Sequence, residues 1–281
     1  MRKIPRQRHQ NDELSALPYF GGKSGRSSTG TGRWVASLLP YRKGYVEPFG
    51  GMAGVLLQRR PSYREIYNDL DGDIVDWWTA IRECPMELAD RLNGTPYSRQ
   101  VFEECVASWG EGDLVERAWK VHVVFTCKMP VRNVEASAFS RDRRGPGRIW
   151  PDQRFEALGE RMRNVVLERM DAVKLLRSIR NKADQVIYCD PPYRSAGYEG
   201  QAYEVKEVDW DALTEVLLLQ KGLVGISGYG DEWDHLGWCR SEWSTNTGVT
   251  PQIGFVDRTE VLWTNFEVHG RRGVDLDSWG T

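Results

Sequence analysis

The segment QVIYCDPPY, residues 185–193, most strongly constrains what this chain can fold into. Four apolar or aromatic residues, 186–189, run directly into an acid, Asp190, and two prolines follow at once. Proline restricts the backbone angle and lacks an amide donor, so a strand must end here and the loop after it is stiff. The segment therefore predicts a buried strand that presents a carboxylate and backbone carbonyls at its carboxyl end.

Further strands alternate with helices along the chain. We expect strands at 45–50, 64–70, 165–170, 185–189, 223–227 and 259–265. Apolar spacing predicts helices from 73 to about 125 and over 209–221, and a helix opening over 52–60. Strands on both sides of a helical middle predict an α/β fold with a parallel sheet and an insertion.

Composition limits the class of protein. The chain has 281 residues, of which 40% are hydrophobic and 28% charged, as in an ordinary soluble protein with one large domain or a core with an inserted lobe. No apolar run approaches the roughly 18 residues of a membrane helix, so we expect no membrane association. The basic start, MRKIPRQRHQ, has no apolar region behind it and does not resemble a secretory signal.

The cysteine content and the net charge indicate the cellular compartment and the way in which the chain could bind nucleic acid. The five cysteines are scattered and odd in number, which favours a reducing cytoplasm over a disulfide framework or a zinc site. The net charge is −2, so any binding of nucleic acid must come from local basic patches rather than from the whole chain's field.

A glycine-rich turn, VEPFGGMAG, follows the first expected strand. In doubly wound sheets, such a turn lies where ligands bind outside the carboxyl ends of the strands, although by itself it is equally consistent with a plain tight turn. Asp69 lies 19 positions after Gly50, at the end of the next strand, where an acid accepts hydrogen bonds from ribose hydroxyls. The two features together favour an adenosine-type ligand. The spacing is not G-x-G-x-x-G, so a nicotinamide cofactor is not favoured.

A second glycine-rich stretch, FGGKS at 20–24, resembles the end of a phosphate-binding P-loop. That motif needs a glycine where this chain has Leu17, and no apolar strand precedes it. A nucleotide triphosphatase is therefore disfavoured.

The strand pattern places Asp190 at the same sheet edge as Glu47 and Asp69. A carboxylate and the Pro191 carbonyl form two adjacent acceptors, which suit an amino group with two hydrogens, such as the exocyclic amine of a base. Tyr193 adds a ring on which a base stacks. Taken alone, D-P-P-Y is more often a rigid turn with a core tyrosine. The glycine turn and the acid in the same sheet favour the binding site.

Seven segments in order resemble the Dam-like DNA adenine methyltransferases. They are PYFGGK (18–23), VEPFGGMAGVLL (46–57), NDLDGDI (68–74), ERMDAVKLL (168–176), YCDPPY (188–193), ISGYGDEWDHL (226–236) and RTEVLWTNF (258–266). The resemblance implies a Rossmann-like, S-adenosylmethionine-dependent methyltransferase sheet with an inserted, mostly helical target-recognition domain. The catalytic domain would comprise 1–74 and 165–281, and the insertion 75–164.

The resemblance also implies an activity and a set of site residues. The expected reaction transfers a methyl group from S-adenosylmethionine to the 6-amino nitrogen of an adenine flipped out of duplex DNA, without a metal. The implied catalytic residues are Asp190, Pro191, Pro192 and Tyr193. The implied cofactor-binding residues are Tyr19, Gly22, Lys23, Glu47, Pro48, Phe49, Gly50, Gly51, Gly54, Asp69, Asp171 and Asp190.

The recognition segment departs from the resemblance. The Dam subgroup reads its target with an N-G-L-x-R-type segment, and the stretch at 127–151 does not align with it. Four arginines and one acid lie between 141 and 148. Such a run is usually a solvated loop, but within this insertion we favour DNA contact, because arginine is the preferred reader of guanine. The expected DNA-binding residues are Arg132, Arg141, Arg143, Arg144 and Arg148.

Three alternatives stay open. An RNA adenine methyltransferase would share the D-P-P-Y chemistry. A cytosine-amine methyltransferase is less favoured, since that group more often carries serine in place of Asp190. A binding module with a dead site is least favoured, because every motif residue keeps its functional type. We expect double-stranded DNA as the partner, a monomer and a cytoplasmic location.

Overall fold

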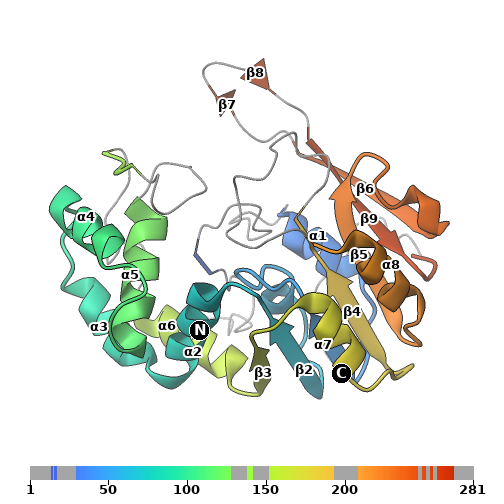
Figure 1. Ribbon diagram of the computed structural model, residues 1–281, viewed down its shortest axis with the longest axis horizontal. Coiled ribbons are helices and arrows are strands. Elements are labelled where there is room, and N and C mark those ends of the chain that lie inside the picture. Colours follow the sequence, from blue (N-terminus) through green and yellow to red (C-terminus); the bar gives the residue numbers. More distant parts are fainter. Residues whose placement is uncertain are drawn as a thin grey trace, which may run out of the picture.

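A seven-stranded sheet forms the centre of the computed structural model (Figure 1). The structure describes residues 14, 16–17, 30–127, 138–141, 152–192, 208–245, 249–250, 254–255 and 258–268. The sheet strands are β1 (Gly44–Glu47), β2 (Arg64–Asn68), β3 (Val165–Glu168), β4 (Gln185–Cys189), β5 (Leu223–Tyr229), β6 (Cys239–Thr245) and β9 (Arg258–Thr264). A separate two-stranded ribbon consists of β7 (Val249–Thr250) and β8 (Gly254–Phe255).

The strand order is β3-β2-β1-β4-β5-β9-β6. The strands from β3 to β5 pair in parallel, whereas β9 runs antiparallel to both β5 and β6. The chain builds outward from β1 to β3 in one direction and from β4 to β5 in the other. The switch point therefore lies between β1 and β4, where ligands bind beyond the carboxyl ends of strands in open α/β sheets. The α/β fold class expected from the sequence is confirmed.

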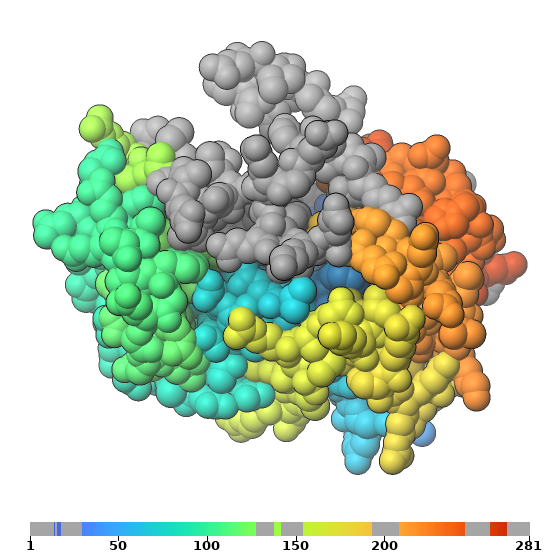
Figure 2. All heavy atoms as spheres, in the orientation of Figure 1, coloured from blue at the N-terminus to red at the C-terminus, as the bar shows by residue number. Residues whose placement is uncertain are grey.

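Helices cover both sides of this sheet. They are α1 (Thr31–Leu38), α2 (Gly72–Glu83), α3 (Pro85–Asn93), α4 (Arg99–Ala107), α5 (Leu114–Cys127), α6 (Asp152–Met162), α7 (Ala172–Ser178) and α8 (Trp210–Leu218). Asp71 caps α2 and Asp209 caps α8. In each case a side-chain oxygen accepts a hydrogen bond from a backbone amide in the first turn of the helix. Figure 2 shows α3–α5 forming one end of the molecule and α8 with β6 and β9 the other.

Two expectations about local structure were wrong, and one strand was missed. Residues 52–60 contain only a short 3-10 helix, η1 (Leu56–Gln58), because Gly51 and Ala53 adopt left-handed φ angles of 46° and 51° that no right-handed helix tolerates. The sheet is not wholly parallel, since β9 reverses direction. Strand β6 was not expected, because its residues, CRSEWST, are mostly polar and lack an apolar run.

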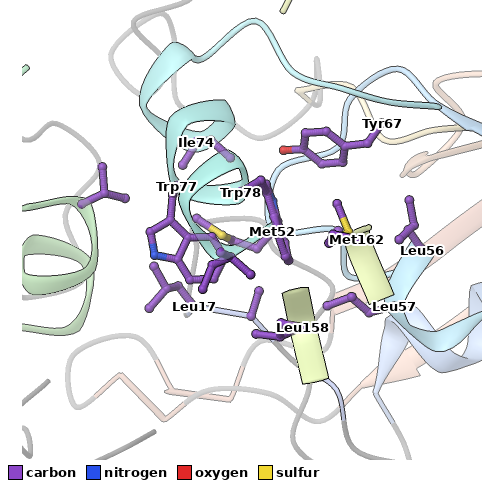
Figure 3. Packing of buried hydrophobic residues seen from close by; sticks show 14 of the residues in the cluster. Leu17, Met52, Leu56, Leu57, Tyr67, Ile74, Trp77, Trp78, Leu158 and Met162 are labelled. Carbon is purple, nitrogen blue, oxygen red and sulfur yellow. The ribbon is translucent and has the colours of Figure 1, made fainter. Parts of the chain in front are cut away.

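Successive strand residues alternate between two hydrophobic cores. Tyr45 and Tyr188 belong to a core shared with α2–α6, whereas Val46 and Ile187 belong to a core shared with α7 and α8. The helical middle thus packs directly on the sheet through residues such as Trp78 (Figure 3). Helix α2 spans the expected boundary at 74/75, and the division into two domains stays a prediction.

A buried ion pair ties α6 to the sheet. Arg161 Nη2 donates to Glu65 Oε1 at 3.0 Å and to the Leu56 carbonyl at 2.9 Å, and Arg161 Nη1 donates to the other Glu65 oxygen. Both side chains are buried. Removal of one partner would leave an uncompensated charge away from water.

We predict that Arg161→Met lowers the free energy of unfolding by about 3–5 kcal/mol, because Glu65 loses its buried counter-charge. Urea denaturation measures the change. The matched double variant Glu65→Leu/Arg161→Met should recover most of the loss, since neither member of the pair is then left as a buried charge without the other. A double variant as unstable as the single one would contradict this explanation.

Candidate active site

Acidic side chains gather at the carboxyl edge of the sheet. Glu47 ends β1, Asp69 follows β2, and Asp190 follows β4. Asp171 lies three residues beyond the end of β3. Because β1–β4 run in parallel, these acids emerge at the same edge, beside the switch point. The edge therefore concentrates acidic groups where a ligand would bind.

The glycine turn after β1 is held by the end of β2. The Gly51 amide donates to Asp69 Oδ2 at 2.7 Å, and the Gly50 amide donates to the Asn68 carbonyl at 2.8 Å. The Gly51 carbonyl accepts from Tyr67 Oη at 2.6 Å and from Trp78 Nε1 at 3.0 Å. A Cβ at Gly50 would lie 2.1 Å from the Tyr67 ring, so only glycine fits against it.

Asn68 was missed by sequence reasoning. Its Nδ2 donates to the Pro48 carbonyl at 2.8 Å and the Met170 carbonyl at 2.9 Å, and its Oδ1 accepts from the Met170 amide at 3.0 Å. The fully buried side-chain amide of Asn68 thus links the end of β2 to the chain just beyond β1 and to the chain just beyond β3. The signal in the sequence was a polar residue at the last position of a buried strand.

Glu47 is a buried carboxyl with like charge nearby. Its Oε2 accepts from Tyr45 Oη at 2.8 Å and from the Leu56 amide at 3.1 Å. Burial raises the pKa of Glu47 to about 8; the hydrogen bond from Tyr45 opposes this rise, and the negative charge of Asp190 adds to it. The carboxyl is therefore largely protonated near neutral pH unless a cation lies beside it.

The acids after β2 have the same character. Burial raises the pKa of Asp69, against the amides of Asp71 and Gly51 that donate to it. Burial also raises the pKa of Asp71 to about 6, with Asp73 and Asp69 adding repulsion. Asp71 was not among the expected site residues, although it lies two positions beyond Asp69.

The comparison with protein families shows the family of the chain. The chain matches the family described as D12 class N6 adenine-specific DNA methyltransferase over residues 19–234, more than half of its length. The chain belongs to this family. It is accordingly an adenine-specific DNA-methylating enzyme, and the expected Dam-like family and activity are confirmed. A comparison with curated proteins found no match.

The structure places part of the expected site of the methyltransferase. Pro48 and Gly54 are buried, Phe49 packs against the second core, and Pro191 is buried after β4. Asp171 Oδ1 accepts from the Lys174 amide at 2.9 Å, so this acid also caps α7. Outside the described residues lie Tyr19, Gly22, Lys23, Arg132, Arg143, Arg144, Arg148 and Tyr193.

Two further observations bear on the site's surroundings. Within the described ranges, no three His, Cys, Asp or Glu side chains are grouped so that they would hold a metal ion. None of the described helices has the length and apolar character needed to cross a membrane. Arg141, the one expected DNA contact among the described residues, is exposed.

We predict that Glu47 makes the methyltransferase less stable as the pH rises. A carboxyl whose pKa rises on folding from 4.5 to about 8 takes up a proton, so its contribution is full below about pH 4.5 and is lost as the pH rises to about 8. Glu47→Gln mimics the protonated side chain. Its stability relative to wild type should therefore increase with pH by up to about 1.4 kcal/mol per unit between pH 5 and 8.

Urea denaturation at pH 5, 6, 7 and 8 measures both proteins. Asp69 and Asp71 are present in both, so their contributions cancel in the difference. A difference independent of pH would contradict the assignment of a raised pKa to Glu47.

Proposed function

We propose that this enzyme transfers the methyl group of S-adenosylmethionine to the 6-amino nitrogen of an adenine rotated out of duplex DNA. The observation that carries the proposal is the convergence of Glu47, Asp69 and Asp190 at the β1/β4 switch point in a chain of the adenine-specific family. A base inside a duplex is unreachable, so the target must leave the stack to meet this edge.

The described residues fit the proposed cofactor. The edge holds buried carboxyls whose pKa values are raised by burial and mutual repulsion, a setting that a sulfonium cation would relieve. Each carboxylate oxygen of Asp69 accepts a hydrogen bond from one backbone amide. A carboxylate oxygen can accept two hydrogen bonds, so Asp69 can still accept hydrogen bonds from ribose hydroxyls. When bound, S-adenosylmethionine supplies an electrophilic methyl group that needs no metal.

Asp190 and the Pro191 carbonyl receive the target amine. Two adjacent acceptors hold both amine hydrogens and draw the nitrogen lone pair out of conjugation with the ring. Pro191 is buried and Pro192 half-buried, so the loop that carries the acceptors is anchored. The protein's contribution is mainly position and charge, held in place before the reaction begins. Tyr193 is proposed to stack on the base.

The helical middle is proposed to recognise DNA. Arginines at 132, 141, 143, 144 and 148 would contact phosphates and base edges, in a domain spanning 75–164 inserted between 1–74 and 165–281. We further infer a monomer in the cytoplasm. All five cysteines are free, which suits a reducing compartment.

We predict that Asp190→Ala lowers the methyl-transfer rate about a hundred-fold or more, because the charged acceptor is lost. Asp190→Asn keeps one acceptor oxygen and should be less damaged. Both variants should still bind S-adenosylmethionine, since Glu47, Asp69 and Asp171 are unchanged. The measurement is transfer of a labelled methyl group to duplex DNA, followed by nucleoside chromatography.

Asp184→Ala is the matched control, because Asp184 is an exposed acid at the opposite end of β4 and should leave the rate unchanged. RNA in place of duplex DNA tests the alternative substrate. Label in cytosine, preference for RNA, or an undiminished rate with Asp190→Ala would refute the proposed reaction.

We also predict that neutralising Arg143 and Arg144 together lowers the salt slope of DNA affinity by about 1.8, if both contact phosphate. The slope is measured by titrating duplex DNA at several salt concentrations. If the salt slope and the sequence preference of DNA binding are both unchanged, these arginines lie on a solvated surface.

A further inference from the structure

The peptide group between Gly51 and Met52 is held in place by hydrogen bonds from the core side. Its carbonyl accepts two hydrogen bonds, from Tyr67 Oη at 2.6 Å and Trp78 Nε1 at 3.0 Å, and both donor side chains belong to the core beneath the turn (Figure 3). No peptide bond in the described residues is cis, so the carbonyl of Gly51 and the amide of Met52 point in opposite directions. The Met52 N–H is therefore turned away from the core.

The Met52 N–H has no hydrogen-bond partner among the described residues. The neighbouring amides do have partners, since Gly51 donates to Asp69 and Ala53 donates to the Gly50 carbonyl. A backbone donor left open at a ligand-binding turn is available to a ligand acceptor. Its direction depends on the groups that hold the other side of the same peptide plane.

Trp78 and its neighbour Trp77 differ in whether the indole N–H has a hydrogen-bond partner. Both indoles are fully buried in α2, and their rings meet edge to face with centroids 4.8 Å apart. Only the Trp78 N–H reaches the glycine turn; the Trp77 N–H is buried without a hydrogen-bond partner in the described part of the chain. Two adjacent tryptophans thus share burial and chemistry but differ in one hydrogen bond.

We propose that Trp78 is a positioning residue for the cofactor turn. Its indole N–H, together with the Tyr67 hydroxyl, holds the Gly51 carbonyl inward and so aims the Met52 N–H at a carboxylate of the ligand. The amino-acid end of S-adenosylmethionine carries such a group, so this inference rests on the proposed function. Trp78 itself lies behind the turn and touches neither the cofactor nor the base.

The backbone at this turn needs such support. Gly51 and Ala53 both have positive φ, and alanine adopts that region rarely. Without the Trp78 donor, the Gly51 carbonyl keeps only the Tyr67 hydroxyl and the turn samples other conformations. A ligand must then order the turn as it binds, which weakens affinity without altering the groups that act on the target amine.

The test compares Trp78→Phe with Trp77→Phe in the full chain. Both changes remove the same atoms from the same core, but only Trp78→Phe also breaks a hydrogen bond, so its melting temperature should be the lower of the two. Trp78→Phe should raise the dissociation constant and the KM of S-adenosylmethionine about tenfold, as expected for one lost hydrogen bond that leaves its acceptor underused. At saturating cofactor, its kcat should stay within about threefold of wild type.

Trp77→Phe should leave the dissociation constant within about twofold of wild type, because the hydrogen bond to Gly51 is intact. Tyr67→Phe removes the other donor and replaces Trp78→Phe as the test if that variant fails to fold. It too should raise KM while leaving kcat nearly unchanged. The double variant Tyr67→Phe/Trp78→Phe should lose more than the sum of the two, since the carbonyl then has no donor.

The positioning role would be overturned if Trp77→Phe and Trp78→Phe changed cofactor affinity equally. It would also be overturned if Trp78→Phe lowered only the thermal stability. A fall in kcat at saturating cofactor with unchanged KM would overturn it as well. If the wild-type protein fails to bind S-adenosylmethionine in the same calorimetry, the proposed function falls, and this outcome is distinct from the preceding ones.

Discussion

The hydrogen bonds made by the end of β2 hold the rest of the site together. Tyr67 donates to the Gly51 carbonyl, Asp69 accepts from the Gly51 amide, and between them Asn68 joins the chain beyond β1 and β3. Three consecutive residues therefore set the relative positions of neighbouring strand ends. These bonds therefore fix the positions of Glu47 and Asp69 relative to each other.

The same edge is electrostatically unfavourable in the absence of a cation. Buried carboxyls with raised pKa values, Glu47 above all, take up protons on folding rather than stabilising the fold as charges. Such clusters are typical of functional sites, where stability is given up for binding. The buried Glu65–Arg161 pair shows the contrast, since there the counter-charge is supplied by α6 itself. At the carboxyl edge, the proposed sulfonium would supply it.

Much of this arrangement was predictable from short apolar segments that end in acids. The strand at 185–189 matches β4 residue for residue, and the helical middle is present as α2–α5. The helix expected over 52–60 was wrong because Gly51 and Ala53 have left-handed backbone angles, and Gly51 is held by Tyr67 and Asp69, which are distant in sequence. Strand β6 was missed because it forms through pairing with β9 and carries little apolar signal of its own.

The same limit applies to the site. Asp190 was predicted because two prolines mark the end of its strand, whereas Asn68 and Trp78 have hydrogen-bond partners that only the tertiary fold brings near. Apolar spacing placed Trp77 and Trp78 on a helix, but it does not tell which indole reaches the turn. Local patterns thus predict which residues take part in the chemistry, and long-range hydrogen bonds show what holds the turn beside them.

The central claim is that the edge beside the β1/β4 switch point binds the methyl donor. The most direct measurement is a crystal structure of the protein with S-adenosylhomocysteine, the demethylated form of the proposed cofactor. We expect density beyond the carboxyl ends of β1 and β4, with the ribose at Asp69 and the amino-acid end at the 50–54 turn. Density at another face of the protein, or a ligand that avoids this turn and Asp69, would contradict the account.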